Sequence, residues 1–344
     1  MKAILYDHSG GPEVLQYVDV AEPMPGPVDV VVDVEACALN RLDLVQRDGW
    51  YHMPGFTYPH IAGMDIAGTV VAVGADVSGT RVGDRVVLDP SLSGVDERSK
   101  LAGRGDLFGE LAVLGATTDG GYAQRCLAPA SHAYPVPDDM PIEHAATFST
   151  CWLTAHHALF DIGALHAGET VLIHAAGSGV SVAGIQLAKH AGATVLATAG
   201  TDEKCARAAR LGADHVLNNR TGDIIGWARQ ITNGAGVQMV FDHVGTALFA
   251  QSLFALGIHG RLVTCGNSSG DQATIPSLGY VFHSGITIKG SDPYRPEEFG
   301  PVWNLFCGQR FAVEIDSHFP LAEAGAAQQK LASNDFFGKI LLHP

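Results

Sequence analysis

Hydrophobic and polar positions alternate in short runs along the first part of the chain. Residues 28–34 and 69–73 follow the two-residue period of a β-strand, and Gly, Pro and Asp turns separate such runs. No long amphipathic helix is evident between residues 1 and 134. The pattern therefore predicts a β-rich region.

From about residue 145 the pattern changes to strands that alternate with helices. An apolar strand at 170–175 leads through a glycine-rich turn into a helix at 182–191, and further strands and helices follow. This alternation predicts a parallel sheet with helices on both faces. The expected later elements are a strand at 194–199, a helix at 202–211, strands at 215–217, 239–242, 261–265 and 286–289, helices near 296–308 and 321–333, and a closing strand at 338–342.

Length and charge narrow the class of protein. A chain of 344 residues exceeds the size of most single cores, so we expect two domains. A net charge of −15 disfavours binding to nucleic acid or anionic membranes, and we expect a small-molecule substrate instead. Six scattered cysteines without a CxxC pair, and no apolar run of signal-peptide or membrane-spanning length, predict reduced thiols and a cytoplasmic protein.

The turn after the strand at 170–175 carries a nucleotide-binding pattern. Glycines at 177 and 179 allow a pyrophosphate to approach the backbone, and the following helix offers free N–H groups to it. The third position of the GxGxxG pattern holds Val182 instead of glycine, so a tight turn without a ligand is the alternative. The predicted contacts are Gly177, Ser178, Gly179 and Val180.

The end of the next strand favours NADPH over NADH. An NAD site usually places a carboxylate there for the ribose hydroxyl, whereas this strand ends in small neutral residues that include Thr201. Lys204 and Arg220 are candidate partners of a 2′-phosphate. In the alternative reading Lys204 is simply solvated, or Asp202 turns inward to hold the ribose of NAD.

Together with these features, several short segments resemble the medium-chain dehydrogenase/reductase family. The resemblance implies a GroES-like β-rich catalytic domain at 1–150 and 292–344, and a Rossmann domain that binds NAD(P) at 151–291. It also implies cofactor contacts at Val244, Gly266 and Lys339. The segments are Gly63–Gly68, Val71–Gly74, Gly83–Val86, Gly120–Ala123, Leu153–Ala155, Leu211–Asp214, Asp242–Gly245 and Phe337–Ile340.

The positions that bind zinc in related alcohol dehydrogenases hold poor ligands here. The resemblance places Asn40, Met64 and Thr150 at the catalytic metal, and none of these side chains suits zinc. Residues 89–115 retain the length of the lobe that holds a structural zinc in relatives, and we interpret them as a relict of it. Its four ligand positions fall on Gly94, Glu97, Lys100 and Phe108.

We therefore expect no zinc, although a rebuilt site remains an alternative. Four residues with better ligands lie one to four positions from the expected places: Cys37, His60, Asp65 and Cys151.

Without zinc, the resemblance is to the quinone oxidoreductase and enone reductase branch, whose motif falls on Asn40, Asp43, Arg47, Gly49 and Tyr51. Asn40 is expected to donate an amide hydrogen bond to a substrate carbonyl, and Tyr51 to bind or protonate the product. Thr154 is expected to pack against the nicotinamide. In the alternative reading, Asp43 only caps a helix or pairs with Arg47. Tyr51 in that reading only covers the mouth of the site.

These observations predict an NADPH-dependent oxidoreductase that transfers hydride to a quinone, an enone or a similar activated carbonyl or alkene without a metal. A zinc-type alcohol dehydrogenase with relocated ligands and a non-catalytic NADPH-binding sensor are the alternatives. Lys339 has the alternative of binding backbone instead of a ligand. By the resemblance we also expect a homodimer that pairs the strand at 286–289.

Overall fold

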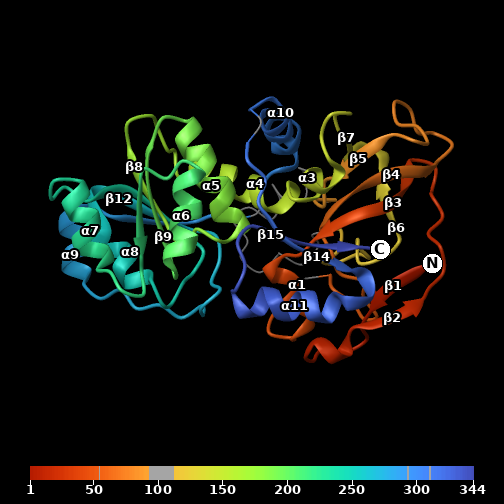
Figure 1. Ribbon diagram of the computed structural model, residues 1–344, viewed down its shortest axis with the longest axis horizontal. Coiled ribbons are helices and arrows are strands. Elements are labelled where there is room, and N and C mark those ends of the chain that lie inside the picture. Colours follow the sequence, from red (N-terminus) through yellow and green to blue (C-terminus); the bar gives the residue numbers. More distant parts are fainter. Residues whose placement is uncertain (54, 93–111, 293, 310) are drawn as a thin grey trace. The chain divides into compact units, whose positions relative to one another are not determined.

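The computed structural model describes residues 1–53, 55–92, 112–292, 294–309 and 311–344 (Figure 1). They form two compact units, of which the first comprises Met1–Thr150 and Arg295–Pro344 and the second Cys151–Tyr294. Most of the expected lobe at 89–115, with Gly94, Glu97, Lys100 and Phe108, lies outside the described residues. No helix in the described ranges is both long and apolar enough to cross a membrane.

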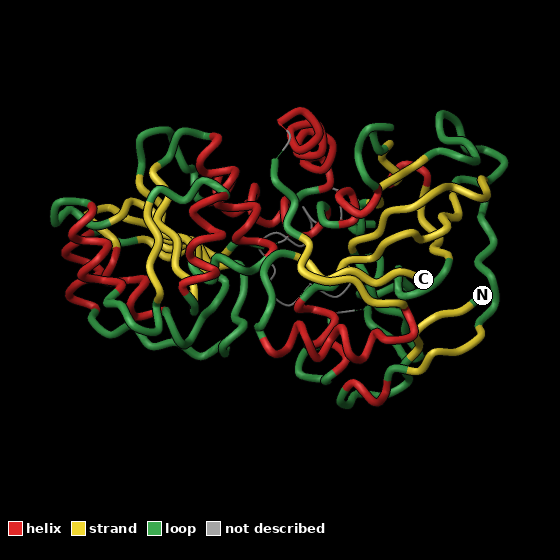
Figure 2. The backbone as a smooth tube through the Cα atoms, viewed as in Figure 1, coloured by secondary structure: helices red, strands yellow, loops and turns green. Residues whose placement is uncertain are grey.

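The first unit is built on one sheet in the order β14-β15-β3-β4-β5-β7, with β6 paired to β3. All these pairs are antiparallel except β14 with β15. Figure 2 shows its strands as yellow stretches of the backbone tube around the C-terminus. The strands are β3 (Asp29–Ala38), β4 (Asp65–Val73), β5 (Arg85–Leu88), β6 (Arg125–Pro129), β7 (Ala133–Pro135), β14 (Ile315–Pro320) and β15 (Lys339–His343), with the separate hairpin β1 (Lys2–Leu5) and β2 (Gln16–Asp19).

Short helices complete this unit. They are α1 (Arg41–Arg47), α3 (Ile142–Ala146), α10 (Phe299–Gln309) and α11 (Ala324–Ser333), with single 3-10 turns at Pro12–Val14, Ala130–His132, Pro296–Glu298 and Leu321–Glu323. The apolar side chains of β3 and β4, among them Val30, Val32 and Ile66, lie in one buried core with Leu321 and Ile340 from the C-terminal segment. Burial of this apolar surface ties the last fifty residues to the first hundred and fifty.

The return of the C-terminal segment positions the candidate site. β15 pairs antiparallel with β3, Leu341 opposite Ala38 and Leu342 opposite Cys37. The N–H of Leu39 also donates to the carbonyl of Ile340 at 3.0 Å. This register brings the first residue of β15, Lys339, beside the point where β3 ends and α1 begins.

The second unit is a six-stranded parallel sheet in the order β10-β9-β8-β11-β12-β13. The order reverses at β8, which lies between β9 and β11. The strands are β8 (Thr170–Ile173), β9 (Thr194–Ala199), β10 (His215–Asn218), β11 (Val237–Asp242), β12 (Leu256–Thr264) and β13 (Thr287–Gly290). Helices join them: α5 (Gly179–His190), α6 (Asp202–Arg210), α7 (Ile224–Ile231), α8 (Phe249–Ala255) and α9 (Leu278–Ser284), preceded by α4 (Ser149–His156) and a π-helical turn at His157–Ile162.

The expected combination of a β-rich domain and a doubly wound parallel sheet is confirmed. Every strand expected after residue 145 is present, and β9 has the expected bounds. β14 was not anticipated from the sequence. β13 lies at the edge of its sheet, and dimerisation through this strand stays a prediction.

Candidate functional site

The end of β3 and the start of α1 place Asn40 and Asp43 together. Asn40 has extended backbone angles and caps α1, and its N–H donates to Asp43 Oδ2 at 2.8 Å. The Tyr122 hydroxyl donates to the same oxygen at 3.0 Å. The Asp43 carboxylate thus accepts a backbone N–H at the start of α1, which is the capping role given above as an alternative. Its alternative pairing with Arg47 is wrong, because the Arg47 guanidinium forms its ion pair with Asp48.

Asp43 is 2 % exposed, and this burial raises the pKa of its carboxyl to about 7. Desolvation is the largest cause, since it disfavours the charged form, whereas the hydrogen bonds from Asn40 and Tyr122 act in the opposite direction. The carboxyl therefore changes its charge near neutral pH inside the fold.

The ammonium of Lys339 lies at the centre of the neighbouring polar group. It is 5 % exposed and donates to Leu39 O at 2.7 Å, Asn40 Oδ1 at 2.8 Å and Asp65 Oδ2 at 2.9 Å. An ammonium has three protons, so these acceptors saturate it. These three contacts are all within the protein, one with backbone and two with side chains, and the predicted contact of Lys339 with the cofactor stays a prediction.

The opposite oxygen of Asp65 is also occupied. Thr150 donates to Asp65 Oδ1 through its backbone N–H at 2.8 Å and through its hydroxyl. The side chain of Met64 turns instead into a small apolar cluster with Val113 and Ala116. Of the three positions aligned with metal ligands, Asn40 contacts the ammonium directly, Thr150 is linked to it through Asp65, and Met64 packs apart in apolar surroundings.

The other two candidate catalytic residues, Tyr51 and Thr154, lie on segments outside the polar group around Lys339. Tyr51 follows α1 and is 46 % exposed, and partial burial raises the pKa of its hydroxyl. Beside it in sequence, His52 stacks on Phe56 with ring centroids 4.4 Å apart. Thr154 is half-buried on α4 and belongs to the second unit. Their proposed roles rest on the resemblance, and no observed contact tests them.

In the second unit, the turn after β8 has the geometry that the glycine pattern predicts. The N–H of Ser178 donates to Ala175 O at 2.8 Å, and Ser178 precedes the first residue of α5, Gly179. Ala175 has a φ of +50°, a value that favours glycine. The first N–H groups of this twelve-residue helix have no partner within it, so they can receive a phosphate.

Sequence reasoning missed the glycine that brings α5 close to the sheet. A Cβ on Gly184 would lie 3.3 Å from the ring of Phe241 on β11 and 3.7 Å from Ile173 on β8. Close packing of helix on strand is the task of the third glycine in a dinucleotide fingerprint. Here it falls to Gly184, two residues beyond Val182, and a glycine within the apolar helical run was the available signal.

A buried polar network fixes the carboxyl ends of the central strands. The His174 ring is hydrogen-bonded to Thr198 Oγ1 at 2.9 Å and Ser252 Oγ at 3.0 Å. Its complete burial lowers the pKa of His174 to about 4, so the ring is neutral. Asp242 in turn accepts the N–H of Val244 at 2.7 Å and thereby orders the loop that follows β11.

At the end of β9, Arg220 lies against Gly200. A Cβ on Gly200 would be 3.1 Å from Arg220 Nε and 3.5 Å from its Cζ. Thr201 caps α6 by accepting the N–H of Lys204 at 3.2 Å. Asp202 accepts a hydrogen bond from Asn218 Nδ2 at 2.7 Å. A guanidinium therefore lies where NAD sites place a carboxylate, and the nearest carboxylate is engaged by Asn218.

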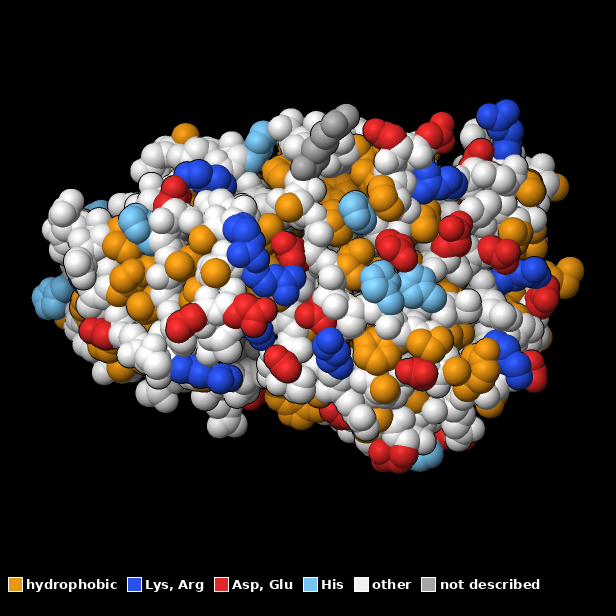
Figure 3. All heavy atoms as spheres, viewed as in Figure 1, with side chains coloured by type: hydrophobic (Ala, Val, Ile, Leu, Met, Phe, Trp, Pro, Cys, Tyr) orange, Lys and Arg blue, Asp and Glu red, His pale blue; other side chains and the backbone are white. Residues whose placement is uncertain are grey.

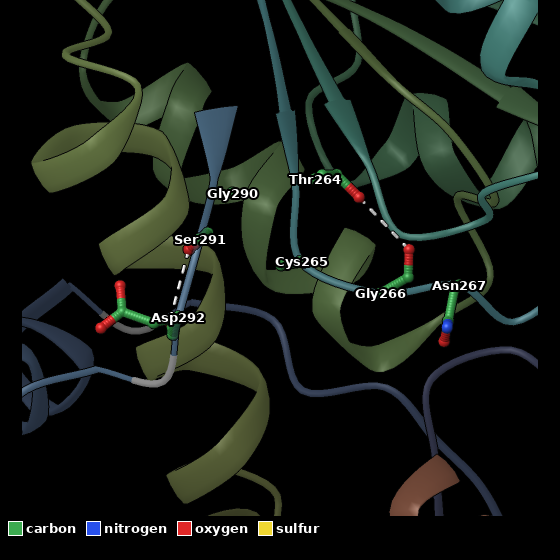
Figure 4. A pocket seen from close by; sticks show the side chains of 7 residues that line it. All are labelled: Thr264, Cys265, Gly266, Asn267, Gly290, Ser291 and Asp292. Atoms are coloured by element: carbon green, nitrogen blue, oxygen red, sulfur yellow. Dashed lines mark hydrogen bonds between the residues drawn. The ribbon is translucent and has the colours of Figure 1, made fainter. Parts of the chain in front are cut away.

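A pocket of about 500 Å³ opens at the carboxyl ends of β12 and β13. Figure 4 shows its two walls, the segment from Thr264 to Asn267 and the segment from Gly290 to Asp292. Ligands of doubly wound sheets bind at this edge. Of the predicted cofactor contacts, Gly266 lines this pocket.

Comparisons with known proteins agree with this architecture. Residues 26–138 match the family model of the alcohol dehydrogenase GroES-like domain, and residues 179–307 that of the zinc-binding dehydrogenase. A quinone oxidoreductase from Pseudomonas aeruginosa is 31% identical over 352 aligned positions, which cover 100% of this chain and 99% of the relative. The chain belongs to the medium-chain dehydrogenase/reductase superfamily, in its quinone oxidoreductase-like branch.

Solved structures of this superfamily have the same fold. A structure described as an NAD-dependent alcohol dehydrogenase is 36% identical, with a TM-score of 0.92 and complete coverage of both chains. The Escherichia coli quinone oxidoreductase complexed with NADPH is 29% identical, with a TM-score of 0.83 and complete coverage of both chains. The predicted family and the GroES-like and Rossmann domains are thus confirmed, and the chain is a nicotinamide-dependent oxidoreductase.

The buried carboxyl of this oxidoreductase predicts a pH dependence of stability. Asp43 has a pKa of about 7 in the folded protein and an ordinary value near 3.8 when unfolded. Between these values the folded state holds one proton more, so its contribution to stability falls as pH rises from about 4 to about 7. In the Asp43→Asn variant this pH-dependent decrease in the free energy of unfolding, on the order of a few kcal/mol, should be absent.

Urea unfolding at pH 5 and pH 8 measures the difference. We compare the free energy of unfolding of Asp43→Asn with that of the wild type at each pH. The difference should favour the variant more at pH 8 than at pH 5. The exposed Asp76→Asn variant of the same unit is the control and should show no such change. An equal effect of Asp43→Asn at both pH values would contradict the raised pKa.

Proposed function

We propose that this chain is an NADPH-dependent reductase of quinones, enones and similarly activated alkenes, and that its reaction needs no zinc. The observation that carries the proposal is the ammonium of Lys339, bound to Asp65 and to Asn40, a position that the resemblance aligns with a zinc ligand. Oxidation of an unactivated alcohol in this fold depends on a metal that acidifies the hydroxyl. Reduction of an already polarised π-system does not.

The residues at this place do not fit zinc. Asn40 and Thr150 offer neutral oxygens, and Met64 is buried in an apolar cluster. The rebuilt site also lacks support. Cys37 is fully buried, which holds the pKa of its thiol well above the usual range, and His60 Nε2 lies 3.2 Å from the carbonyl of Gly115.

The second unit fits a phosphorylated dinucleotide, which supplies the hydride when bound. The turn at Gly177–Val180 and the start of α5 receive the pyrophosphate, and Arg220 beside Gly200 favours a 2′-phosphate. The pocket at Gly266, on the other side of the switch point at β8, suits the nicotinamide end. Val244, Thr201 and Lys204 contribute at the neighbouring strand ends.

Lys339 orients the amide of Asn40 for the reaction. Because Asn40 Oδ1 accepts from the ammonium, Nδ2 is the group left to face a substrate, and its only observed bond in the described residues is a long one of 3.4 Å to Ala38 O. Hydride addition to the β-carbon of an enone places negative charge on the carbonyl oxygen. The Asn40 N–H stabilises that charge, and the Tyr51 hydroxyl supplies the proton. Thr154 packs against the nicotinamide.

NADPH oxidation by the purified protein tests the proposal. We expect turnover with 1,4-benzoquinone or cyclohexenone, unchanged after dialysis against dipicolinate, and no oxidation of ethanol with NADP⁺. Loss of turnover on chelation, with recovery on addition of zinc, would show a metal-dependent enzyme. Tight NADPH binding without turnover of any acceptor would show a sensor.

The preference for NADPH has a separate test at the end of β9. Arg220→Gln removes a charge-assisted contact with the 2′-phosphate and should raise KM for NADPH by about 10- to 100-fold while leaving KM for NADH nearly unchanged. Gly200→Asp introduces a carboxylate next to Arg220 and should shift the preference towards NADH. Steady-state kinetics with both cofactors measure the two effects.

Arg210→Gln, an exposed change in the last turn of α6, is the matched control and should alter neither KM. An equal rise in KM for NADPH and NADH in Arg220→Gln would contradict the assignment of Arg220 to the 2′-phosphate.

A further inference from the structure

Three potential metal ligands meet on the first unit, outside the site described above. Glu143 comes from α3, His318 from β14 and His343 from β15, and their ligand atoms all lie within 4.8 Å of one another. His318 Nδ1 is 3.0 Å from His343 Nε2, and both nitrogens are 3.7 Å from Glu143 Oε1. Histidine side chains lie side by side over this part of the sheet in Figure 3. We infer that the three side chains form a binding site for a divalent transition metal, best suited to Zn²⁺.

The distances are those of a tetrahedral face. Zinc binds imidazole nitrogen and carboxylate oxygen at about 2.0–2.2 Å, so adjacent ligands of a tetrahedron lie about 3.3–3.6 Å apart. The separations of 3.0, 3.7 and 3.7 Å bracket this range. Shifts of a few tenths of an ångström would bring all three atoms to bonding distance of one ion. The partial exposure of the site leaves the fourth position to water.

A backbone contact already selects the ring nitrogen that His343 offers to the metal. Its Nδ1 lies 2.9 Å from the carbonyl of Glu35 and donates to it, because a carbonyl can only accept. In the neutral ring, Nε2 is then unprotonated and has a lone pair available to a metal. It lies 3.0 Å from His318 Nδ1 and 3.7 Å from Glu143 Oε1. Such an outer contact is typical of metal-binding histidines, where it fixes the tautomer and the ring orientation.

The bland alternative is a metal-free contact in which His318 Nδ1–H donates to His343 Nε2. It accounts for the 3.0 Å distance and for the near-parallel rings, whose planes differ by 24°. In that arrangement Glu143 lies 3.7 Å from each nitrogen, beyond hydrogen-bond distance, and forms only a loose ion pair when a histidine is protonated. Zinc would use all three atoms, and the proton on His318 Nδ1 would leave or move to Nε2.

The site is separate from the one that carries the proposed function. His343 and Lys339 are the two ends of β15, about 13 Å apart along an extended strand. A metal here would join α3 to β14 and β15 without touching the Lys339 ammonium. It would act as a structural clamp on the first unit.

Zinc titration of the full-length protein tests the inference. We expect one high-affinity Zn²⁺ per chain by calorimetry, a rise in Tm on addition of Zn²⁺, and a visible tetrahedral band when Co²⁺ replaces it. His318→Gln and Glu143→Gln should each weaken Zn²⁺ binding by about 100-fold or more and remove both signals. Both residues are at least partly exposed, so these variants should fold, which their Tm without metal verifies.

His8→Ala is the matched control, since His8 is also a surface histidine paired with a carboxylate, that of Asp7, but belongs to no metal-ligand group among the described residues. It should leave Zn²⁺ binding unchanged. Absence of stoichiometric Zn²⁺ binding, or equal affinity in His318→Gln and the wild type, would overturn the site. These readouts do not include turnover of quinones. A failure to bind Zn²⁺ is therefore distinct from a failure of the proposed reaction.

Discussion

The ion pair between Lys339 and Asp65 is the interaction on which the rest of the account depends. Both side chains are buried, so neither charge is stable without the other, and breaking such a pair costs about 3–5 kcal/mol. The pair joins the last strand of the chain to β4, and through Asn40 and Thr150 it fixes the start of α1 and the start of α4. One ammonium thus holds the starts of β15, α1 and β4 together and determines which way the Asn40 amide points.

The second unit supplies a complementary constraint. Its strand order reverses at β8, and the buried histidine after this strand joins the end of β9 to the middle of α8 through neutral hydrogen bonds. Glycine at 184 brings α5 against Phe241, which aims the start of the helix at the edge where phosphates bind. Arg220 and the pocket at Gly266 then lie on opposite sides of the switch point, in the order expected for the two halves of a dinucleotide.

The sequence predicts much of the fold because the central strands β8, β9 and β11 are largely apolar, buried runs bounded by glycine and polar turns. β14 escaped prediction because its segment, Ile-Asp-Ser-His-Phe-Pro, is half polar and only partly buried. The glycine pattern, Asn40 and Arg220 could be singled out from local sequence. The partners of Lys339 could not, since Asp65 lies 274 positions away and only the pairing of β15 with β3 brings them together. The cluster of Glu143, His318 and His343 was hidden for the same reason.

The most direct test of the central claim is a crystal structure of the NADPH complex, grown with added Zn²⁺ and measured at the zinc absorption edge. The account predicts that Lys339 Nζ stays within hydrogen-bond distance of Asn40 and Asp65, with no anomalous peak beside them. A zinc peak within about 2.2 Å of an Asp65 carboxylate oxygen, with Lys339 displaced, would contradict it.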